Sequence, residues 1–442
     1  MIKSIRIQGF KSYQDSTLRL SQVTFLIGAN GAGKSNAIDA LRFLNWMGRG
    51  VRLDDIDSRL GSAPGQVRGT SDDLFRSGLA SFDFEIELSK NKSATFQQTI
   101  ASASRGVEQE RTLVVSSERL CCAGRKQPYY CLRKQTASKF SDSVDVEYDN
   151  FSRGGNKPRI TCSNRQAIFY QLLSESRFES ARSKKEIPDC ARMVKDSLGQ
   201  ILFLDADLSK MRGYTRKLKG RALEKDASNI SSVVYNICQD QKLKRELLAL
   251  IQALPELNIS NISFVETEIG DVMLQLHEGV AGGRITPITL LSDGTLRLLA
   301  IAACVLSAPA GSMVVIEEID NGLHPSRAKH VVDSLYRIAD ERKIQMLVTT
   351  HNPALMSAIP IKKVGEVLCC YRNHFQGSSE VLCLGDVPRF VELSMKGKLG
   401  DLATSNILDE VVKDNRTADQ IVAERQRQID ELSELFAKGS EA

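Results

Sequence analysis

GANGAGKS, at residues Gly28 to Ser35, matches the phosphate-binding pattern G-x-x-x-x-G-K-[ST] at every fixed position. The apolar run before it, residues 23–27, is typical of a buried strand, and residues 36–44 after it are expected to form a helix. Glycines let backbone N–H groups turn inward onto phosphate oxygens, and the N-terminus of the following helix adds partial positive charge. A Gly-rich turn that precedes a helix by chance is the alternative, but both flanks favour a site for a nucleoside triphosphate.

Several positions of this stretch carry predicted contacts to the nucleotide. Lys34 can reach the β- and γ-phosphates and is counted among the catalytic residues, and the Ser35 hydroxyl can bind Mg²⁺. The predicted nucleotide-binding set here is Asn30, Gly31, Gly33, Lys34, Ser35 and Asn36.

Composition places the chain among ordinary soluble globular proteins. Of its 442 residues, 42% are hydrophobic and 26% are charged, and this length accommodates about two to four domains. No apolar run reaches the ~18 residues of a membrane-spanning helix, and the alternating start, residues 1–7, indicates a strand rather than a signal peptide. We therefore expect a cytoplasmic protein with no membrane partner.

The cysteines and the net charge exclude little more. The ten cysteines contain no C-x-x-C pair, so neither a zinc site nor a disulfide framework is indicated, and reduced structural thiols are expected. The net charge of +5 permits contact with nucleic acid without implying it.

Strands and helices alternate after residue 285, which predicts a mostly parallel α/β sheet. The phosphate-loop unit at the start of the chain has too few strands for a sheet of its own. We therefore predict one α/β nucleotide-binding sheet that is built from both ends of the sequence. The predicted units are an N-terminal lobe at 1–100, an insertion at 101–255, a C-terminal lobe at 256–400 and a helical tail at 401–442.

The insertion is predicted to begin with irregular β structure and loops at 101–160 and to continue as a helical, basic segment at 163–255. One short buried strand, 201–204, interrupts the helical pattern. The tail carries a partial apolar stripe, which consists of Ile421, Ile429, Leu432 and Phe436. This stripe packs either on its own domain or against a partner or second copy.

A second motif, MVVIEE at residues 313–318, is an apolar strand that ends in two carboxylates. Phosphoryl transfer needs such a pair opposite the phosphate loop, because one carboxylate holds Mg²⁺ or its waters and the next polarises the attacking water. Glu317 stands at the metal position, where Asp is usual, and Glu318 is the candidate general base. The alternative is an ordinary strand that ends in surface acids, but the phosphate loop and this strand support each other.

A third motif, LLSDGTLR at residues 290–297, directly precedes an apolar helix. Ser292 and Gly294 resemble the serine and glycine of an ABC-type signature, and N–H groups at a helix N-terminus suit a γ-phosphate. N-capping by Ser292 or Asp293 is the structural alternative, and the two functions are compatible.

Two further elements follow the carboxylates, NGLHP at 321–325 and VTTHNP at 348–353. The second is a strand that ends in His351. A histidine there can hydrogen-bond the γ-phosphate or the attacking water, although a lone histidine is more often structural. Its place at the end of a strand that should open onto the nucleotide favours the functional role.

These elements, in this order, resemble the ABC-type ATPases of the SMC/RecF-like group. More narrowly, they are similar to the stand-alone AAA-type ATPases related to the overcoming-lysogenization-defect (OLD) and Septu-type defence proteins. The resemblance rests on GANGAGKS (28–35), LLSDGTLR (290–297), VVIEEIDNGLHP (314–325) and TTHNP (349–353). It implies an ABC-type P-loop ATPase head with a mixed sheet and a mostly helical insertion, with ATP and Mg²⁺ as its cofactors.

The resemblance also implies a head-to-tail homodimer with two ATP molecules enclosed, in which residues 28–35 of one copy face residues 292–294 of the other. In such a dimer Glu318 would be the catalytic base for hydrolysis to ADP and phosphate, Glu317 would support Mg²⁺, and His351 would be the switch histidine. The family also uses a glutamine to contact Mg²⁺, for which Gln66 and Gln97 are both open.

The long coiled coil of SMC proteins and the nuclease domain of OLD proteins are not recognisable in this sequence, so an effector or nuclease would be a separate chain. We expect an ATP-hydrolysing dimeric switch that gates a nucleic-acid-directed complex in bacterial anti-phage defence. The alternative is an ATP-dependent scaffold or sensor that assembles or sequesters a partner toxin or effector with little turnover. An ABC transporter subunit is disfavoured, because the insertion is too long.

A basic stretch lies between Lys210 and Lys225, and Tyr214 is within it. Such a strip can follow the phosphate backbone of DNA or RNA. The alternatives are a solvated helix face or contacts to the nucleotide and a partner chain, and Arg212 is a candidate for the ATP site. The basic residues are Lys210, Arg212, Arg216, Lys217, Lys219, Arg221 and Lys225.

Overall fold

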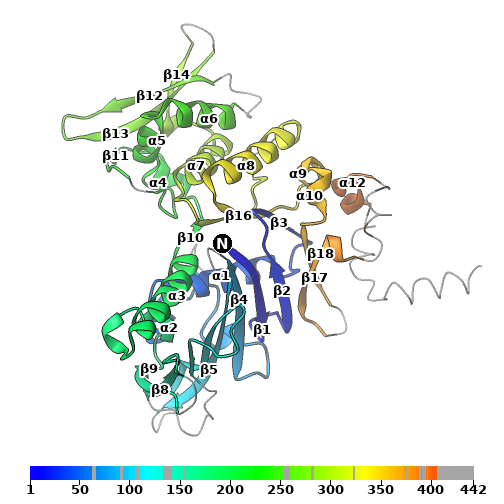
Figure 1. Cartoon of the computed structure of the whole chain (residues 1–442). Coiled ribbons are helices and arrows are strands. Elements are labelled where there is room, and N and C mark those ends of the chain that lie inside the picture. Colours follow the sequence, from blue (N-terminus) through cyan, green and yellow to red (C-terminus); the bar gives the residue numbers. More distant parts are fainter. Residues whose placement is uncertain are drawn as a thin grey trace, which may run out of the picture.

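The computed structural model describes residues 1–405 apart from 62–65, 90–92, 106–109, 133–141, 153–155, 221, 253–258, 280–282, 322–323, 374–375, 388–389, 391–394 and 396. Within these residues the chain is an α/β structure with three sheets, which Figure 1 shows as a broad lower sheet, a central sheet and a small upper sheet.

The central sheet joins strands from both ends of the chain in the order β10-β15-β16-β3-β17-β18. Its neighbouring strands run parallel except for β17 and β18, which are antiparallel. Val23 of β3 pairs with Met346 of β16, so the strand before the phosphate loop lies between C-terminal strands, as predicted. The strands are β3 (Val23–Ile27), β10 (Ile201–Leu204), β15 (Met313–Ile316), β16 (Gln345–Thr349), β17 (Leu368–Arg372) and β18 (Ser379–Cys383).

The lower sheet is antiparallel and has the order β2-β1-β4-β5-β6-β7-β8-β9. In β4 every second residue is buried, which is the pattern of a strand with one face on a core. The strands are β1 (Ile2–Gln8), β2 (Asp15–Arg19), β4 (Ser81–Ser89), β5 (Ser93–Arg105), β6 (Glu110–Cys122), β7 (Tyr130–Leu132), β8 (Ser143–Tyr148) and β9 (Arg159–Ser163).

The sheets divide the chain differently from the predicted units. The expected boundary at residue 100 falls inside β5, and β6 to β9 extend the N-terminal sheet rather than forming part of a separate insertion. β10, which was assigned to the insertion, pairs in parallel with β15 and so belongs to the central sheet. β6 to β9 follow one another as antiparallel neighbours, so the N-terminal sheet continues past residue 100 without a break. β10 pairs with a strand more than a hundred residues later, and such a pairing leaves no local signal in the sequence.

The upper part combines a small antiparallel sheet with helices that cover one face of the central sheet (Figure 1). Its strands are β11 (Thr215–Arg216), β12 (Ile259–Glu266), β13 (Asp271–Glu278) and β14 (Ile285–Pro287). The α-helices in the described part of the chain are α1 (Lys34–Gly48), α2 (Ile168–Gln171), α3 (Ala181–Gly199), α4 (Leu208–Met211), α5 (Ile230–Cys238), α6 (Gln241–Ile251), α7 (Asp293–Ser307), α8 (Ala328–Arg342), α9 (Pro353–Ala358), α10 (Ile361–Val364) and α12 (Leu399–Thr404).

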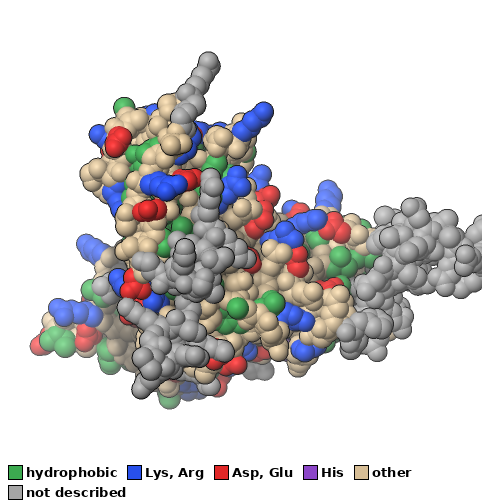
Figure 2. Space-filling view, turned by 90° about the horizontal axis from the view of Figure 1, so that it is seen from below, with side chains coloured by type: hydrophobic (Ala, Val, Ile, Leu, Met, Phe, Trp, Pro, Cys, Tyr) green, Lys and Arg blue, Asp and Glu red, His purple; other side chains and the backbone are tan. Residues whose placement is uncertain are grey.

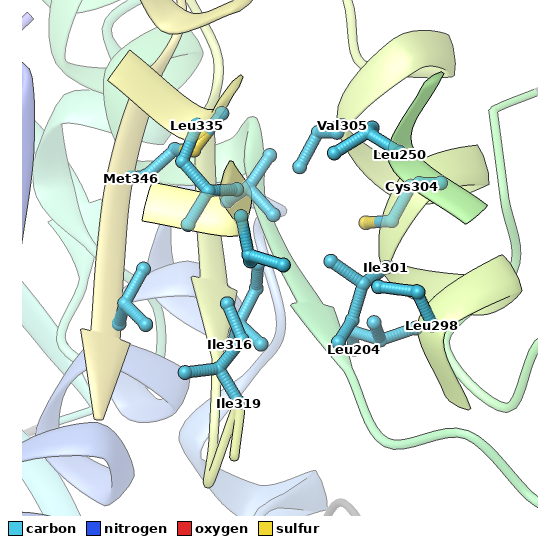
Figure 3. Close-up of a cluster of buried hydrophobic side chains, with 14 of the residues drawn as sticks. Leu204, Leu250, Leu298, Ile301, Cys304, Val305, Ile316, Ile319, Leu335 and Met346 are labelled. Carbon is cyan, nitrogen blue, oxygen red and sulfur yellow. The ribbon is translucent and has the colours of Figure 1, made fainter. Parts of the chain in front are cut away.

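The central sheet separates two hydrophobic cores. Phe25 and Ile27 of β3 belong to the core shared with α5 to α8, whereas Leu26 belongs to the core shared with α1 and the lower sheet. Figure 3 shows part of the first core, where Ile301 of α7 and Ile316 of β15 are directed toward each other. Burial of each such side chain contributes roughly 1.5–3 kcal/mol, which fixes the strands whose ends carry the site.

Three other expectations concern surfaces and termini. None of the described helices combines the length and apolarity that crossing a bilayer would require. Within the described residues the ten cysteines form no disulfide with one another. Of the predicted tail, α12 reaches Thr404, and the apolar stripe from Ile421 to Phe436 lies outside the described residues.

Candidate nucleotide-binding site

The phosphate loop connects β3 to α1 and depends on glycine at two close approaches. Gly28 has φ +147°, and a Cβ atom there would lie 2.1 Å from the carbonyl oxygen of Cys370. Gly33 has φ +119°, and its Cβ would lie 2.3 Å from Oγ of Ser379. A side chain at either position would therefore collide with β17 or β18 and displace the loop.

Two side chains from outside the loop hold its backbone in place. The hydroxyl of Tyr13 donates to the carbonyl of Gly33 at 3.0 Å, and Sγ of Cys370 donates to the carbonyl of Ala32 at 3.2 Å. The two side chains also contact each other at 3.4 Å. Burial raises the pKa of the Cys370 thiol to about 11, so the thiol stays protonated as a donor. Neither residue lies in a recognisable motif, because only the pairing of distant segments brings them under the loop.

Lys34 lies against its own loop. Its Nζ donates to the carbonyl oxygens of Gly28 at 2.5 Å and Ala29 at 3.0 Å. Burial lowers the pKa of Lys34, while the nearby Glu318 and Asp320 carboxylates oppose that shift. The ammonium group is therefore close to the acids that follow β15, as the motif order predicted.

The next two residues of α1 differ in their surroundings. The side chain of Ser35 is half-buried and forms no hydrogen bond with another described residue. The Asn36 amide donates to Oγ of Ser12 at 2.7 Å, which ties α1 to the turn after β1. The Ser35 hydroxyl is thus the group of this pair that is available to a ligand.

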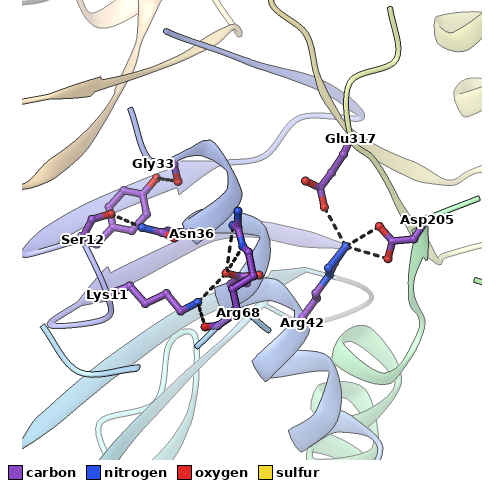
Figure 4. Close-up of polar contacts among 10 residues, drawn as sticks. Lys11, Ser12, Gly33, Asn36, Arg42, Arg68, Asp205 and Glu317 are labelled. Atoms are coloured by element: carbon purple, nitrogen blue, oxygen red, sulfur yellow. Dashed lines mark hydrogen bonds and ion pairs between the residues drawn. The ribbon is translucent and has the colours of Figure 1, made fainter. Parts of the chain in front are cut away.

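Glu317, at the end of β15, forms an ion pair with Arg42 of α1 (Figure 4). Nη2 of Arg42 lies 2.8 Å from Oε1 of Glu317 and 2.9 Å from both carboxylate oxygens of Asp205. Burial raises the pKa of Glu317, and the Arg42 charge opposes this rise. Sequence reasoning missed Arg42 and Asp205, although an acid directly after the short strand 201–204 was a visible signal.

Glu318 is exposed and has an unusual backbone conformation, with φ +48°. Its N–H donates to Oγ1 of Thr349 at 2.9 Å, and Oε2 of its side chain accepts from the Asn321 amide at 2.8 Å. Left-handed geometry costs a non-glycine residue about 1–2 kcal/mol, and such strain gathers at functional sites. The backbone therefore aims the Glu318 carboxylate outward at the strand end.

His351 follows β16 at the same edge of the sheet. Its Nε2 lies 3.4 Å from Oδ2 of the buried Asp320. The second oxygen of that acid, Oδ1, is buried without a hydrogen-bond partner among the described residues. Sequence reasoning did not single out Asp320, although it stands two residues after Glu318, within the stretch VVIEEIDNGLHP at 314–325.

Ser292 is the N-cap of α7, as the structural alternative proposed. Its Oγ accepts from the N–H of Thr295 at 3.3 Å and contacts that residue's hydroxyl at 2.8 Å. Asp293 does not cap the helix but pairs with Arg212 at 2.7 Å. Among the described residues no hydrogen bond or ion pair joins Ser292 or Gly294 to the phosphate loop.

The structure thus brings one group of the predicted site residues to a single sheet edge, and Ser292 and Gly294 are not part of that group. Lys34, Glu317, Glu318 and His351 follow three neighbouring parallel strands, β3, β15 and β16, and the carboxyl ends of such strands meet at one edge where ligands bind. A cavity of about 240 Å³ lies beside this edge. Its lining consists of Leu204, Asp205, Ala206, Arg297, Ile301, Ile316, Glu317, Glu318 and Asn321.

The donor set fits a magnesium ion held together with a nucleotide. Within the described part of the chain no three His, Cys, Asp or Glu side chains cluster as a metal site. Mg²⁺ is commonly bound through one or two protein oxygens plus substrate phosphates. The Ser35 hydroxyl and the Glu317 carboxylate are oxygen donors of that kind.

Of the two candidate glutamines, Gln66 is close in sequence to a residue that contacts the phosphate-loop helix. Arg68, two residues after it, pairs with Asp39 of α1 at 3.2 Å, and Lys11 pairs with the same carboxylate at 2.7 Å. Gln97 instead lies in β5, paired with Arg119 in the lower sheet, and is exposed.

The basic stretch from Lys210 to Lys225 is largely neutralised within the chain. Lys210 pairs with Asp226, Lys217 with Glu266, and Lys225 with Asp205. Arg212 is engaged by the loop before α7, Arg216 and Lys219 are exposed, and Arg221 lies outside the described residues. On the face seen in Figure 2, Lys and Arg side chains likewise lie among Asp and Glu side chains.

The sequence matches the family described as AAA ATPase domain over residues 1–356. That match spans most of the chain, and the chain therefore belongs to this family and is an ATPase. The predicted ATPase activity and the SMC/RecF-like ABC type are confirmed, and the narrower likeness to OLD and Septu-type proteins stays a prediction.

Two curated proteins are similar to the chain. An ATP/GTP phosphatase of Helicobacter pylori is 22% identical over 361 residues, which cover 80% of this chain and 85% of that protein. The DNA double-strand break repair Rad50 ATPase of Methanococcus maripaludis is 22% identical over 278 residues, which cover 60% of this chain but 23% of that protein.

Solved structures of SMC heads are also similar to the chain. An SMC head bound to the C-winged helix domain of ScpA is 15% identical, with a TM-score of 0.47 and coverage of 86% of this chain and 96% of that one. The SMC head from Thermotoga maritima is 15% identical, with a TM-score of 0.41 and coverage of 86% and 98%. At this sequence identity and TM-score, the similarity says nothing about the partners of this chain.

Proposed function

We propose that the chain is an ATP-driven switch in which two copies pair head to tail and enclose two ATP molecules. The division of the site carries this proposal. The phosphate loop and the acids share one sheet edge, whereas no hydrogen bond or ion pair among the described residues joins Ser292 or Gly294, at the start of α7, to the phosphate loop. Leu290, two residues before Ser292, is 65% exposed and would lie in the contact with a second copy. A second copy would bring Ser292 and Gly294 to the phosphates.

Within this proposal each residue at the sheet edge has one role. The Lys34 ammonium exchanges the two loop carbonyls for oxygens of the β- and γ-phosphates. The Glu318 carboxylate takes the proton of the attacking water, and His351, oriented by Asp320, contacts the γ-phosphate or that water. Ser35 and Glu317 would hold the Mg²⁺, whose charge neutralises the phosphate oxygens.

The substitution Glu318→Gln tests the dimer, because it keeps the shape of the side chain and removes the base. We expect the variant to bind ATP, to hydrolyse it at least about a hundredfold more slowly, and to dimerise at saturating ATP by light scattering. Lys34→Ala is the control that should stay monomeric. A Glu318→Gln protein that remains monomeric would exclude the enclosed dimer. If turnover falls while partner function persists, the ATP-dependent scaffold or sensor is favoured.

We also propose that the switch gates a nucleic-acid-directed complex with a separate effector or nuclease chain, in anti-phage defence. The support is the similarity to Rad50, which is named for repair of DNA breaks. The neutralised stretch 210–225 gives little support to a DNA or RNA contact there. Native purification of the ATP-trapped Glu318→Gln protein, with mass spectrometry and nucleic-acid sequencing, tests this proposal. Recovery of neither an effector nor nucleic acid would count against it.

A further inference from the structure

One continuous segment, residues 205–212, touches both parts of the divided site. At its start Asp205 accepts from Nη2 of Arg42, the nitrogen that also donates to Glu317. At its end Arg212 donates to the carbonyl oxygens of Thr289 and Leu291, each at 2.8 Å. We call residues 205–212 the strap, because they connect the acid at the end of β15 with the loop before α7.

The strap is fixed along its length. The Asp207 carboxylate caps α4 by accepting from the N–H of Ser209 at 3.0 Å, and Met211 is fully buried. The backbone N–H groups of Asp205 and Asp207 each donate at 2.9 Å, to the carbonyls of Lys225 and Asp226. Packed elements of this kind shift as units rather than deforming continuously, so a movement at one end reaches the other.

Arg42 connects the N-terminal end of the strap to Glu317. Its side chain is 8% exposed, and it is balanced by Asp205 and Glu317. A buried cation needs an anionic partner. When the Glu317 carboxylate binds another cation, Asp205 is the acid that still balances the charge of Arg42. The contact between Arg42 and the strap therefore depends on whether Glu317 is paired with Arg42.

We propose that Arg42 and Asp205 are positioning residues for Glu317, and that the strap couples the position of Glu317 to the loop before α7 of the same chain. One consequence rests on the proposed dimer. The loop of each copy would complete the site of the other copy, so nucleotide at one site would alter the second through the strap.

A double-substitution cycle tests whether the strap acts as one unit. Asp205 and Arg212 are at opposite ends of the strap, and independent effects of Asp205→Asn and Arg212→Gln on ATP turnover would therefore multiply. We expect each single substitution to lower kcat by about tenfold and to change KM for ATP by no more than about twofold. The kcat of the double variant should equal that of the slower single variant. Lys217→Gln, which breaks the ion pair with Glu266 just after β11 and outside the strap, is the control and should leave kcat unchanged. A double variant about a hundredfold slower would overturn the proposal.

Amide hydrogen exchange tests the coupling inside one chain, without reliance on dimer formation. In dilute protein shown to be monomeric by light scattering, ATP with Mg²⁺ should change the exchange of residues 288–295. In Asp205→Asn, a fluorescent ATP analogue should still bind, but the exchange of these residues should no longer respond. A response that persists in Asp205→Asn would overturn the strap. A failure of Glu318→Gln to dimerise would count only against the proposed dimer.

Discussion

Oδ2 of Asp320 lies 3.4 Å from Nε2 of His351, which places a buried acid directly behind the histidine at the end of β16. The side chain of Asp320 is 5% exposed, whereas that of His351 is 51% exposed. The acid is therefore fixed by packing, and the ring is open to the edge where the phosphate loop lies. An acid in this position sets the tautomer and the orientation of an imidazole.

The pair predicts that Asp320→Asn lowers kcat for ATP by about 10- to 100-fold with little change in KM, because an orienting partner is lost while the binding groups remain. Steady-state ATP hydrolysis measures both constants. Asp333→Asn on α8, which removes an exposed acid paired with Lys329, is the matched control and should retain wild-type kcat. An equal loss in ATP affinity would assign Asp320 a purely structural role.

The left-handed conformation of Glu318 predicts opposite effects of Glu318→Gly on stability and on activity. Glycine removes backbone strain of about 1–2 kcal/mol, so the melting temperature should rise by roughly 1–4 °C while ATP hydrolysis is lost. Lys343, at the end of α8, has φ +55° and lies outside the site, so Lys343→Gly should raise the melting temperature without loss of activity. Calorimetry and a phosphate-release assay check both variants. A lower melting temperature for Glu318→Gly than for the wild type would show that the backbone at Glu318 is not strained.

The phosphate loop predicts unequal costs for two glycine substitutions. In Gly28→Ala the new Cβ meets a backbone oxygen of Cys370 at 2.1 Å, whereas at Gly31 no atom lies within 4 Å. We expect Gly28→Ala to cost at least about 3 kcal/mol of unfolding free energy, and Gly31→Ala about 1 kcal/mol from its positive φ alone. Urea unfolding monitored by circular dichroism measures both, and similar costs would show that the contact with β17 does not constrain the loop.

The thiol of Cys370 predicts a loss of stability at alkaline pH. Burial raises its pKa from the ordinary 9.0 to about 11, so the folded state retains a proton that the unfolded chain releases. Its stabilising contribution is complete below pH 9.0 and disappears as the pH rises to about 11, at most about 2–3 kcal/mol. Melting temperatures between these pH values should fall less steeply for Cys370→Ala than for the wild type. The half-exposed Cys121 provides the control, since Cys121→Ala should leave the slope unchanged.

Several predictions from sequence depended on local patterns and were confirmed. The apolar run before the two carboxylates is β15, residues 313–316. The sheet shared by both ends of the chain followed instead from the small number of strands around the phosphate loop, and the pairing of β3 with β16 confirms it. The assignment of residues 101–160 to a separate insertion did not match the sheets, because β6 to β9 pair onto β5. Alternation identifies a strand, but it does not identify the strand's neighbour.

Short stretches of the sequence were enough to predict the chemistry of this protein. A glycine-rich loop between an apolar strand and a helix, and two carboxylates after a second apolar strand, are local patterns that any reader of the chain can find. The folded arrangement was needed to show that Arg42 contacts both Asp205 and Glu317, that Asp320 lies behind His351, and that residues 205–212 reach the loop before α7. These contacts join residues far apart in the chain, so side-chain packing and strand order create them, and no short stretch of sequence encodes them.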